Sequence, residues 1–315
     1  MTPQMEAQVP SREPYLGSVR FFKHLILTTI ALLIIIPTAL CVALTVQVSA
    51  LRAAAQTPAA PNLAAGDHES DNSIQGSTVS LPVETPPWQE LYPDFYAQPA
   101  KLATVDQDKT VYLTFDDGPS ARTPEILEIL AKYNVKATFF VVGRSDQQSR
   151  QWMRDIVAAG HTIGMHSYTH DYKTVYANVE NFLEDYDKIY NLIYDATGVY
   201  PQISRFPGGS INGYNGATYE NIISELVRRG FVYFDWNVSS GDAASNTKTP
   251  AAKLVSGALS RVNSLRRAVV LMHDAVDKKT TVEALPAIIQ GYRDAGFTFA
   301  PLTAEVVPVA YGYPK

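Results

Sequence analysis

Two adjacent aspartates and two histidines four positions apart are the residues of this sequence best suited to chemistry. They are Asp116, Asp117, His166 and His170. Two imidazoles and one carboxylate form the ligand set of a catalytic zinc site, which leaves a coordination position open for water. Both histidines can reach one ion at this spacing, and Asp117 could supply the oxygen. Asp116 would then be free to take a proton from water, whereas the alternative is that the aspartate pair caps a helix.

These residues lie at the ends of predicted strands. Seven short runs of β-branched and aromatic residues predict strands at residues 111–115, 137–142, 162–166, 203–206, 231–235, 268–272 and 297–300. Helical patterns separate the runs, so we expect a parallel sheet, either open and doubly wound or closed into a barrel. Active sites of such folds lie at the carboxyl ends of the strands. Ionisable residues stand there in five runs: Asp116 with Asp117, His166, Arg205, Asp235, and His273 with Asp274.

The composition is that of a folded protein of ordinary size. The chain has 315 residues, of which 46% are hydrophobic and 18% charged. Its net charge of −5 argues against nucleic-acid binding, because phosphate contacts require a basic surface. A single cysteine allows no intrachain disulfide. No feature of the sequence identifies a protein partner.

The region before residue 101 predicts a membrane anchor and a tether. Residues 25–51 carry no charge and exceed the roughly 20 residues that a spanning helix needs. Arginine and lysine residues precede this run and none occurs between Arg52 and Lys101, which predicts that the N-terminus lies in the cytoplasm. The alternative is a signal peptide cleaved near Ala50.

We therefore divide the chain into four parts. Residues 1–24 are a cytoplasmic N-terminus, 25–51 a transmembrane signal anchor, 52–100 a flexible extracytoplasmic linker and 101–315 the catalytic domain. An aromatic stretch late in the linker could pack on the domain. The catalytic domain should lie outside the cell membrane, or be secreted if the N-terminal segment is cleaved.

Five ordered motifs resemble those of the polysaccharide deacetylases, the fourth carbohydrate esterase family. Residues 114–119 (TFDDGP) and 166–170 (HSYTH) resemble the first two motifs without a gap. Residues 205–209 (RFPGG) resemble the third, 235–242 the fourth and 271–273 (LMH) the fifth. The resemblance covers about residues 108–303, nearly the whole globular part.

The resemblance implies a distorted seven-stranded parallel barrel that hydrolyses N-acetyl groups of N-acetylhexosamine polymers. It implies one divalent metal ion, usually Zn²⁺, with Co²⁺ and Mn²⁺ as alternatives. Asp117, His166 and His170 would bind the metal. Asp116 would be the general base and His273 the general acid.

The remaining motif residues would support these groups. Arg205 would orient Asp116, Leu271 would line the pocket for the acetyl methyl, and the Gly208 amide would help to stabilise the oxyanion. The acid of the fourth motif aligns with Asp242, which would hold His273, and Asp235 is the alternative.

The fourth motif lacks the tryptophan that usually follows its acid, because Ala243 stands there. The nearby Trp236 could contact the substrate instead, as could three tyrosines that could equally be packing or surface residues: Tyr168, Tyr172 and Tyr214.

The substrate follows from the expected location. An outward-facing tethered deacetylase suggests peptidoglycan, deacetylated at N-acetylglucosamine. Chitin oligomers, N-acetylmuramic acid, an exopolysaccharide and an O-acetyl esterase reaction of the xylan type are alternatives. A catalytically inactive glycan-binding protein is the alternative from another class, although binding alone would not need a metal, a base and an acid.

Overall fold

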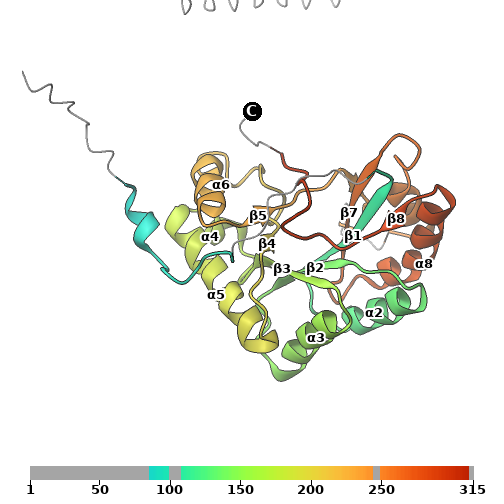
Figure 1. Cartoon of the computed structure of the whole chain (residues 1–315), viewed down its shortest axis with the longest axis horizontal. Coiled ribbons are helices and arrows are strands. Elements are labelled where there is room, and N and C mark those ends of the chain that lie inside the picture. Colours follow the sequence, from blue (N-terminus) through green and yellow to red (C-terminus); the bar gives the residue numbers. More distant parts are fainter. Residues whose placement is uncertain (1–84, 99–107, 244–248, 312–315) are drawn as a thin grey trace, which may run out of the picture. The chain divides into compact units, whose positions relative to one another are not determined.

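One parallel sheet of eight strands forms the centre of the catalytic region. The computed structural model describes residues 85–98, 108–243 and 249–311, whose arrangement is shown in Figure 1. The strand order is β5-β4-β3-β2-β1-β7-β6, and β8 pairs with β1. The strands are β1 (Thr110–Asp116), β2 (Thr138–Val142), β3 (Thr162–Ser167), β4 (Ile203–Ser204), β5 (Val232–Tyr233), β6 (Val238–Ser239), β7 (Arg267–His273) and β8 (Thr298–Phe299).

The predicted parallel sheet is confirmed, and its strand count is corrected. Each of the seven predicted runs coincides with a strand, but β6 adds an eighth along the free edge of β7. The path of paired strands ends at β5 and β6, with no ladder joining these two among the described residues. The expected barrel is therefore a curled half-barrel, in which four of the strands contain only two residues each.

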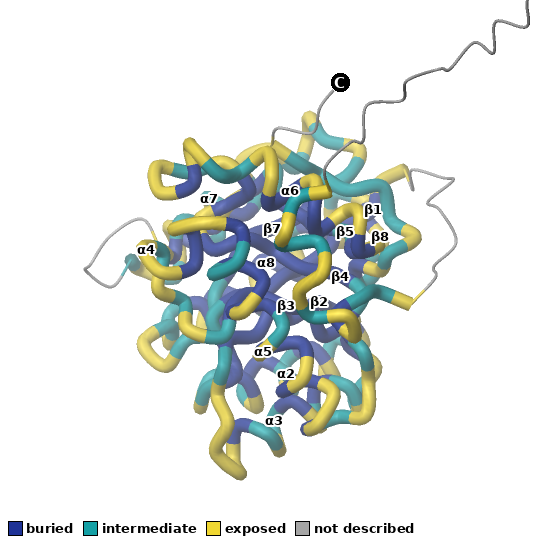
Figure 2. Tube along the Cα trace, turned by 90° about the vertical axis from the view of Figure 1, so that its left-hand side faces the viewer, coloured by how far each residue is buried: buried dark blue, intermediate teal, exposed yellow. Residues whose placement is uncertain are grey.

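The central strands are apolar because both of their faces are covered. Every residue of β1 and β2 is buried, because the helices cover one face of the sheet, and side chains of the half-barrel interior and the C-terminal segment cover the other. Figure 2 shows the buried trace at the centre and the exposed trace in the outer loops and helix surfaces. The covering helices are α2 (Arg122–Lys132), α3 (Gln147–Ala158), α4 (Tyr172–Val175), α5 (Val179–Thr197), α6 (Tyr219–Arg228), α7 (Ala251–Ala258) and α8 (Lys279–Asp294).

Helix α5 illustrates how the sequence sets the helix ends. Asn178 caps its N-terminus by accepting a hydrogen bond from the Asn181 amide at 2.7 Å. Gly198 ends it in the left-handed conformation, at φ 73°. The apolar residues of α5 form a stripe along one side of the helix and are buried in the core. None of the described helices has the length and apolar character of a membrane span, and residues 25–51 lie outside the described part of the chain.

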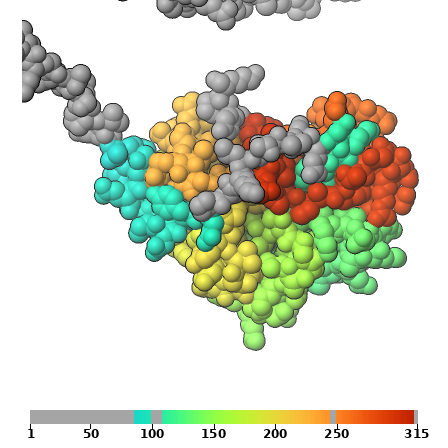
Figure 3. All heavy atoms as spheres, viewed as in Figure 1, coloured from blue at the N-terminus to red at the C-terminus, as the bar shows by residue number. Residues whose placement is uncertain are grey.

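Residues 85–98, hereafter the N-terminal strap, pack against α5 and α6 (Figure 3). The strap contains a short 3-10 helix, η1 (Pro87–Glu90), and inserts Phe95 fully into the core. The buried Arg229 guanidinium donates hydrogen bonds to four strap carbonyls, those of Trp88, Leu91, Tyr92 and Phe95. Buried Glu225 accepts from Arg229 Nε at 2.7 Å and balances its charge.

Candidate active site

The two longest strands, β1 and β7, are neighbours in the sheet and carry the residues predicted to be the base and the acid. Asp116 ends β1 and His273 ends β7, and the two are direct partners in the ladder between these strands. Asp117 follows in the left-handed conformation, at φ 72°, so the chain turns sharply after Asp116. Two consecutive carboxylates therefore leave the strand end in different directions.

Three predicted metal ligands converge beside this strand end. The ligand atoms of Asp117, His166 and His170 all lie within 4.8 Å of one another. Asp117 Oδ1 is 3.4 Å from His166 Nε2 and 3.1 Å from His170 Nε2. This oxygen is buried yet has no hydrogen-bond partner, which is unusual for a buried polar atom. Burial would raise the pKa of Asp117, but the two imidazoles hold it well below its usual range. The three groups fit a divalent cation.

Hydrogen bonds to neighbouring groups orient His166 and His170. His166 Nδ1 lies 2.8 Å from the Arg205 carbonyl oxygen. As a donor to that oxygen, Nδ1 carries the proton and leaves Nε2 free to bind a cation. His170 is in the left-handed conformation, and its backbone N–H donates to Ser167 Oγ at 2.8 Å.

Asp185 holds the loop that links the two histidines. This buried aspartate of α5 accepts hydrogen bonds from the Ser167 hydroxyl, the Tyr168 amide, and both the amide and hydroxyl of Thr169, at 2.6–2.9 Å. Sequence analysis did not assign a role to Asp185. Its position among the apolar residues of α5 was the one feature of the sequence that could have indicated a buried acid.

Arg205 places a fixed positive charge against Asp116. Its fully buried guanidinium donates to Asp116 Oδ1 at 3.0 Å, to Thr114 Oγ1 at 2.6 Å and to the Phe234 carbonyl at 2.9 Å. The guanidinium carbon also lies 4.4 Å from the centre of the Phe140 ring. These contacts on every side hold Asp116 in one orientation.

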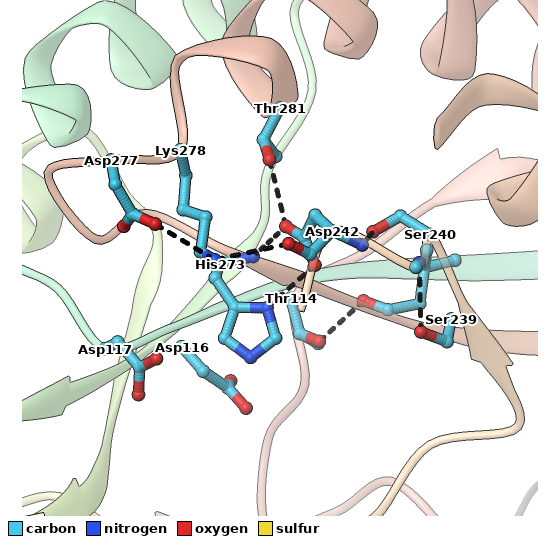
Figure 4. Close-up of polar contacts among 12 residues, drawn as sticks. Thr114, Asp116, Asp117, Ser239, Ser240, Asp242, His273, Asp277, Lys278 and Thr281 are labelled. Carbon is cyan, nitrogen blue, oxygen red and sulfur yellow. Dashed lines mark hydrogen bonds and ion pairs between the residues drawn. The ribbon is translucent and has the colours of Figure 1, made fainter. Parts of the chain in front are cut away.

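Asp242 contacts His273 through both carboxylate oxygens (Figure 4). Oδ1 is 2.8 Å from His273 Nδ1, while Oδ2 accepts from the His273 amide at 2.8 Å and from Thr281 Oγ1 at 2.9 Å. The His273 ring thus lies between Asp242 and the Asp116–Asp117 pair, with Nε2 left for a ligand. Burial would lower the pKa of His273, but the hydrogen bond and charge of Asp242 raise it to about 9.

The alternative support for His273 was Asp235, and the structure contradicts it. Asp235 accepts hydrogen bonds from the amide and hydroxyl of Ser210, at 2.8 and 2.5 Å, and from the Tyr311 amide at 2.6 Å. It therefore joins the loop after β4 to the C-terminal segment. Burial raises the pKa of Asp235 in spite of these contacts.

The predicted substrate contacts lie around the same strand ends. Leu271 stands two residues before His273, so both side chains project from the same face of β7. Gly208 adopts φ 76° in the loop after β4. Trp236 follows β5, where its ring lies 5.8 Å from the Arg205 guanidinium carbon and 5.5 Å from the Tyr311 ring.

Asp274 is a further buried acid beside the site. It accepts from Thr123 Oγ1 at 2.6 Å, and burial raises its pKa to about 7. Its carboxyl packs so closely on Gly118 that a Cβ there would lie 2.2 Å from Oδ2. The glycine of the TFDDGP motif therefore makes room for an acid that joins the end of β7 to the start of α2.

Comparison with known proteins agrees with this geometry. A family model described as polysaccharide deacetylase matches residues 104–225. A peptidoglycan-N-acetylglucosamine deacetylase of Bacillus cereus is 35% identical over 61% of this chain and 68% of its own length.

Solved structures extend the similarity to the fold. The catalytic domain of peptidoglycan N-acetylglucosamine deacetylase from Eubacterium rectale matches with a TM-score of 0.64 and 35% identity, covering 69% of this chain and 98% of that one. A polysaccharide deacetylase from Bacillus cereus matches with a TM-score of 0.58 and 32% identity, over 64% of this chain and 97% of that one.

Proposed function

This chain belongs to the polysaccharide deacetylase family, and we propose that it removes the acetyl group from N-acetylglucosamine units of peptidoglycan. As a member of this family, it is a metal-dependent hydrolase of N-acetyl groups in cell-wall polysaccharide. The choice of sugar rests on the relatives from Bacillus cereus and Eubacterium rectale, whose names state that substrate.

We propose Zn²⁺ as the metal, held by Asp117, His166 and His170. Two imidazoles and a carboxylate with an open position suit zinc among the common divalent ions. When bound, the ion polarises the acetamide carbonyl and makes water more acidic. The hydrogen bond from His166 to the Arg205 carbonyl keeps the ligand ring in the required tautomer.

The opposed placement of Asp116 and His273 is the observation that carries the proposal. Asp116 takes a proton from the attacking water, and Arg205 holds its carboxylate in place. The Gly208 N–H donates to the oxygen that becomes negative in the transition state. His273 Nε2 then protonates the leaving amine, which is too basic to depart as an anion. A base and a separate charged acid, paired across β1 and β7, meet this requirement.

We further propose that residues 25–51 anchor the enzyme in the cell membrane with residues 101–315 outside. The uncharged run and the basic residues before it support this orientation. Fractionation of cells that express the tagged protein, with protease added to intact cells, tests it. Recovery in the culture medium of a protein shortened by its N-terminal segment would instead indicate cleavage near Ala50.

Product mapping of treated peptidoglycan tests the substrate. Purified peptidoglycan is incubated with the zinc-loaded enzyme, digested to muropeptides and analysed by mass spectrometry, beside a measurement of acetate. We expect loss of acetyl from N-acetylglucosamine, and no loss in the presence of a chelator. Release only from chitin oligomers, from N-acetylmuramic acid or from O-acetylated xylan would reassign the substrate. Glycan binding without release would indicate an inactive binding protein.

Two variants separate the proposed roles. Asp116→Asn should lower kcat by about 10²–10⁴-fold while the protein still binds one metal ion. His166→Ala should lose both the metal and the activity, because it removes a ligand. Metal content is measured by plasma mass spectrometry on the same samples. An active Asp116→Asn enzyme would show that another group is the base.

A further inference from the structure

The loop after β4 leaves a notch beside the metal ligands, and an aromatic ring fills it. Gly208 is in the left-handed conformation, at φ 76°, and has no side chain. A Cβ at this position would lie 2.8 Å from Cε1 and 3.3 Å from Oη of Tyr172. Tyr172, the first residue of α4, therefore occupies the space that a side chain at position 208 would otherwise take.

Tyr172 is also fixed relative to the cation ligands. Its ring meets the His170 ring edge-on, with centroids 5.3 Å apart and planes at 89°. It is only partly buried, so part of the ring faces the solvent beside the site.

Tyr214 extends the same aromatic surface outward. Its ring lies 5.1 Å from that of Tyr172, and 57% of the residue is exposed. Ile211, in the same loop, is 42% exposed. Exposed apolar residues that gather beside a polar site mark a ligand contact more often than isolated ones do.

Hydrogen bonds hold the loop that presents Tyr214. Asn212 Nδ2 donates to the Pro207 and Gly209 carbonyls, at 3.2 and 3.0 Å. Asn215 accepts from the Asn212 amide at 2.9 Å, and Tyr176 Oη donates to the Pro207 carbonyl at 2.8 Å. The exposed ring thus belongs to an ordered loop.

We infer that Tyr172 and Tyr214 form one wall of a subsite for the sugar unit next to the one that is deacetylated. The apolar face of a pyranose ring would stack on these rings while the acetamide of its neighbour lies at the cation. This inference rests on the proposed function, because it assumes that the acetamide of a glycan chain occupies the site. The wall replaces the missing tryptophan of the fourth motif as the aromatic contact.

Chain-length dependence tests the wall. KM and kcat are measured on chitopentaose for the wild type and for Tyr214→Ala, Tyr172→Phe and Tyr172→Ala. The control is Tyr194→Ala. Tyr194 is an exposed tyrosine in the last turn of α5, and its ring stacks on that of Tyr200. We expect Tyr214→Ala to raise KM by about three- to tenfold, the size of one aromatic stacking contact. Its kcat should stay within about twofold, and Tyr194→Ala should match the wild type.

Direct binding keeps this result separate from the proposed function. Calorimetry compares chitopentaose with N-acetylglucosamine on zinc-loaded Asp116→Asn protein, with and without Tyr214→Ala. If the wall binds a neighbouring sugar, Tyr214→Ala should weaken the affinity for chitopentaose and leave the affinity for N-acetylglucosamine unchanged. Wild-type protein that binds the pentamer but releases acetate from neither the pentamer nor peptidoglycan would refute the proposed function and leave the wall standing. Equal pentamer affinity with and without Tyr214→Ala, or no preference for the pentamer over the monomer, would overturn the wall.

Discussion

Replacing Asp242 with asparagine tests how the site keeps its acid protonated. Asp242 contacts His273 through both oxygens and also accepts a hydrogen bond from Thr281. Asparagine keeps the size of the side chain but removes the charge. We expect the pKa of His273 to fall. Burial lowers this pKa, and the variant lacks the carboxylate charge that otherwise raises it.

The size of the effect follows from the raised pKa. Asp242 accounts for most of the rise in the His273 pKa from 6.5 to about 9. If the variant returns it to its ordinary value, the protonated fraction at pH 8.5 falls by about 50- to 100-fold, and at pH 6 it changes little. A bound cation lowers the pKa in both proteins, so the difference between them is the quantity to compare.

The pH profile of kcat/KM is the assay. The alkaline limb should move down by about 2–2.5 pH units in Asp242→Asn, because the His273 pKa falls from about 9 toward 6.5. Asp235→Asn is the matched control, because it removes a buried acid that contacts Ser210 and Tyr311; it should lower kcat without moving the limb. Superimposable alkaline limbs for the wild type and Asp242→Asn would refute the reasoning.

The ion pair between Asp242 and His273 also affects how the stability of the fold depends on pH. The pKa of His273 is higher in the folded protein than its ordinary 6.5, so the pair stabilises the fold fully below that value and progressively less as pH rises through about 9. The stability difference between chelator-treated wild type and Asp242→Asn, from urea unfolding, should therefore shrink between pH 6 and pH 10. A difference that grows with pH would contradict this sign.

Three other substitutions follow from contacts described above. Asp185→Asn should weaken zinc binding by about 10–100-fold, measured by competition with a chromophoric chelator, because the loop between the histidines loses its anchor; unchanged affinity would remove Asp185 from that role. Gly208→Ala should lower activity through its collision with Tyr172, and adding Tyr172→Ala should restore part of the loss; a double variant no better than Gly208→Ala would exclude the collision. Arg229→Ala should destabilise the domain by about 1–3 kcal/mol in thermal unfolding, because it removes the donor to four strap carbonyls and leaves Arg228 as the remaining partner of Glu225; a protein of unaltered stability would contradict that account.

Much of the fold could be predicted because buried parallel strands appear as short apolar runs. Strand β6 was missed because Val238 and Ser239 are a two-residue pairing with no pattern of their own. The sequence also could not predict whether the sheet closes into a barrel, because closure depends on whether the two edge strands pair and not on any local pattern.

The gathering of acids and imidazoles at one edge of the sheet was easier to predict than the residues that hold them in place. Acids and imidazoles at strand ends are conspicuous, because chance and helix capping rarely place several of them at one edge of a sheet. Asp185 was missed because an acid on an amphipathic helix usually belongs to the solvated face. The choice between Asp235 and Asp242 depended on side-chain direction after a short strand, which spacing does not determine. The close approach of Tyr172, in α4, to Gly208, in the loop after β4, was likewise not indicated by any local pattern.

The hydrogen bonds from Arg229 to the N-terminal strap have a mechanical consequence. A pulling force applied to the chain ahead of residue 85 would meet four carbonyl contacts at the end of α6 and the embedded ring of Phe95 before it reached β1. Strands β1 and β7, which carry Asp116 and His273, lie beyond that point along the line of load. Such a force would therefore be taken up by the contacts of the strap, and the spacing of Asp116 and His273 would be preserved.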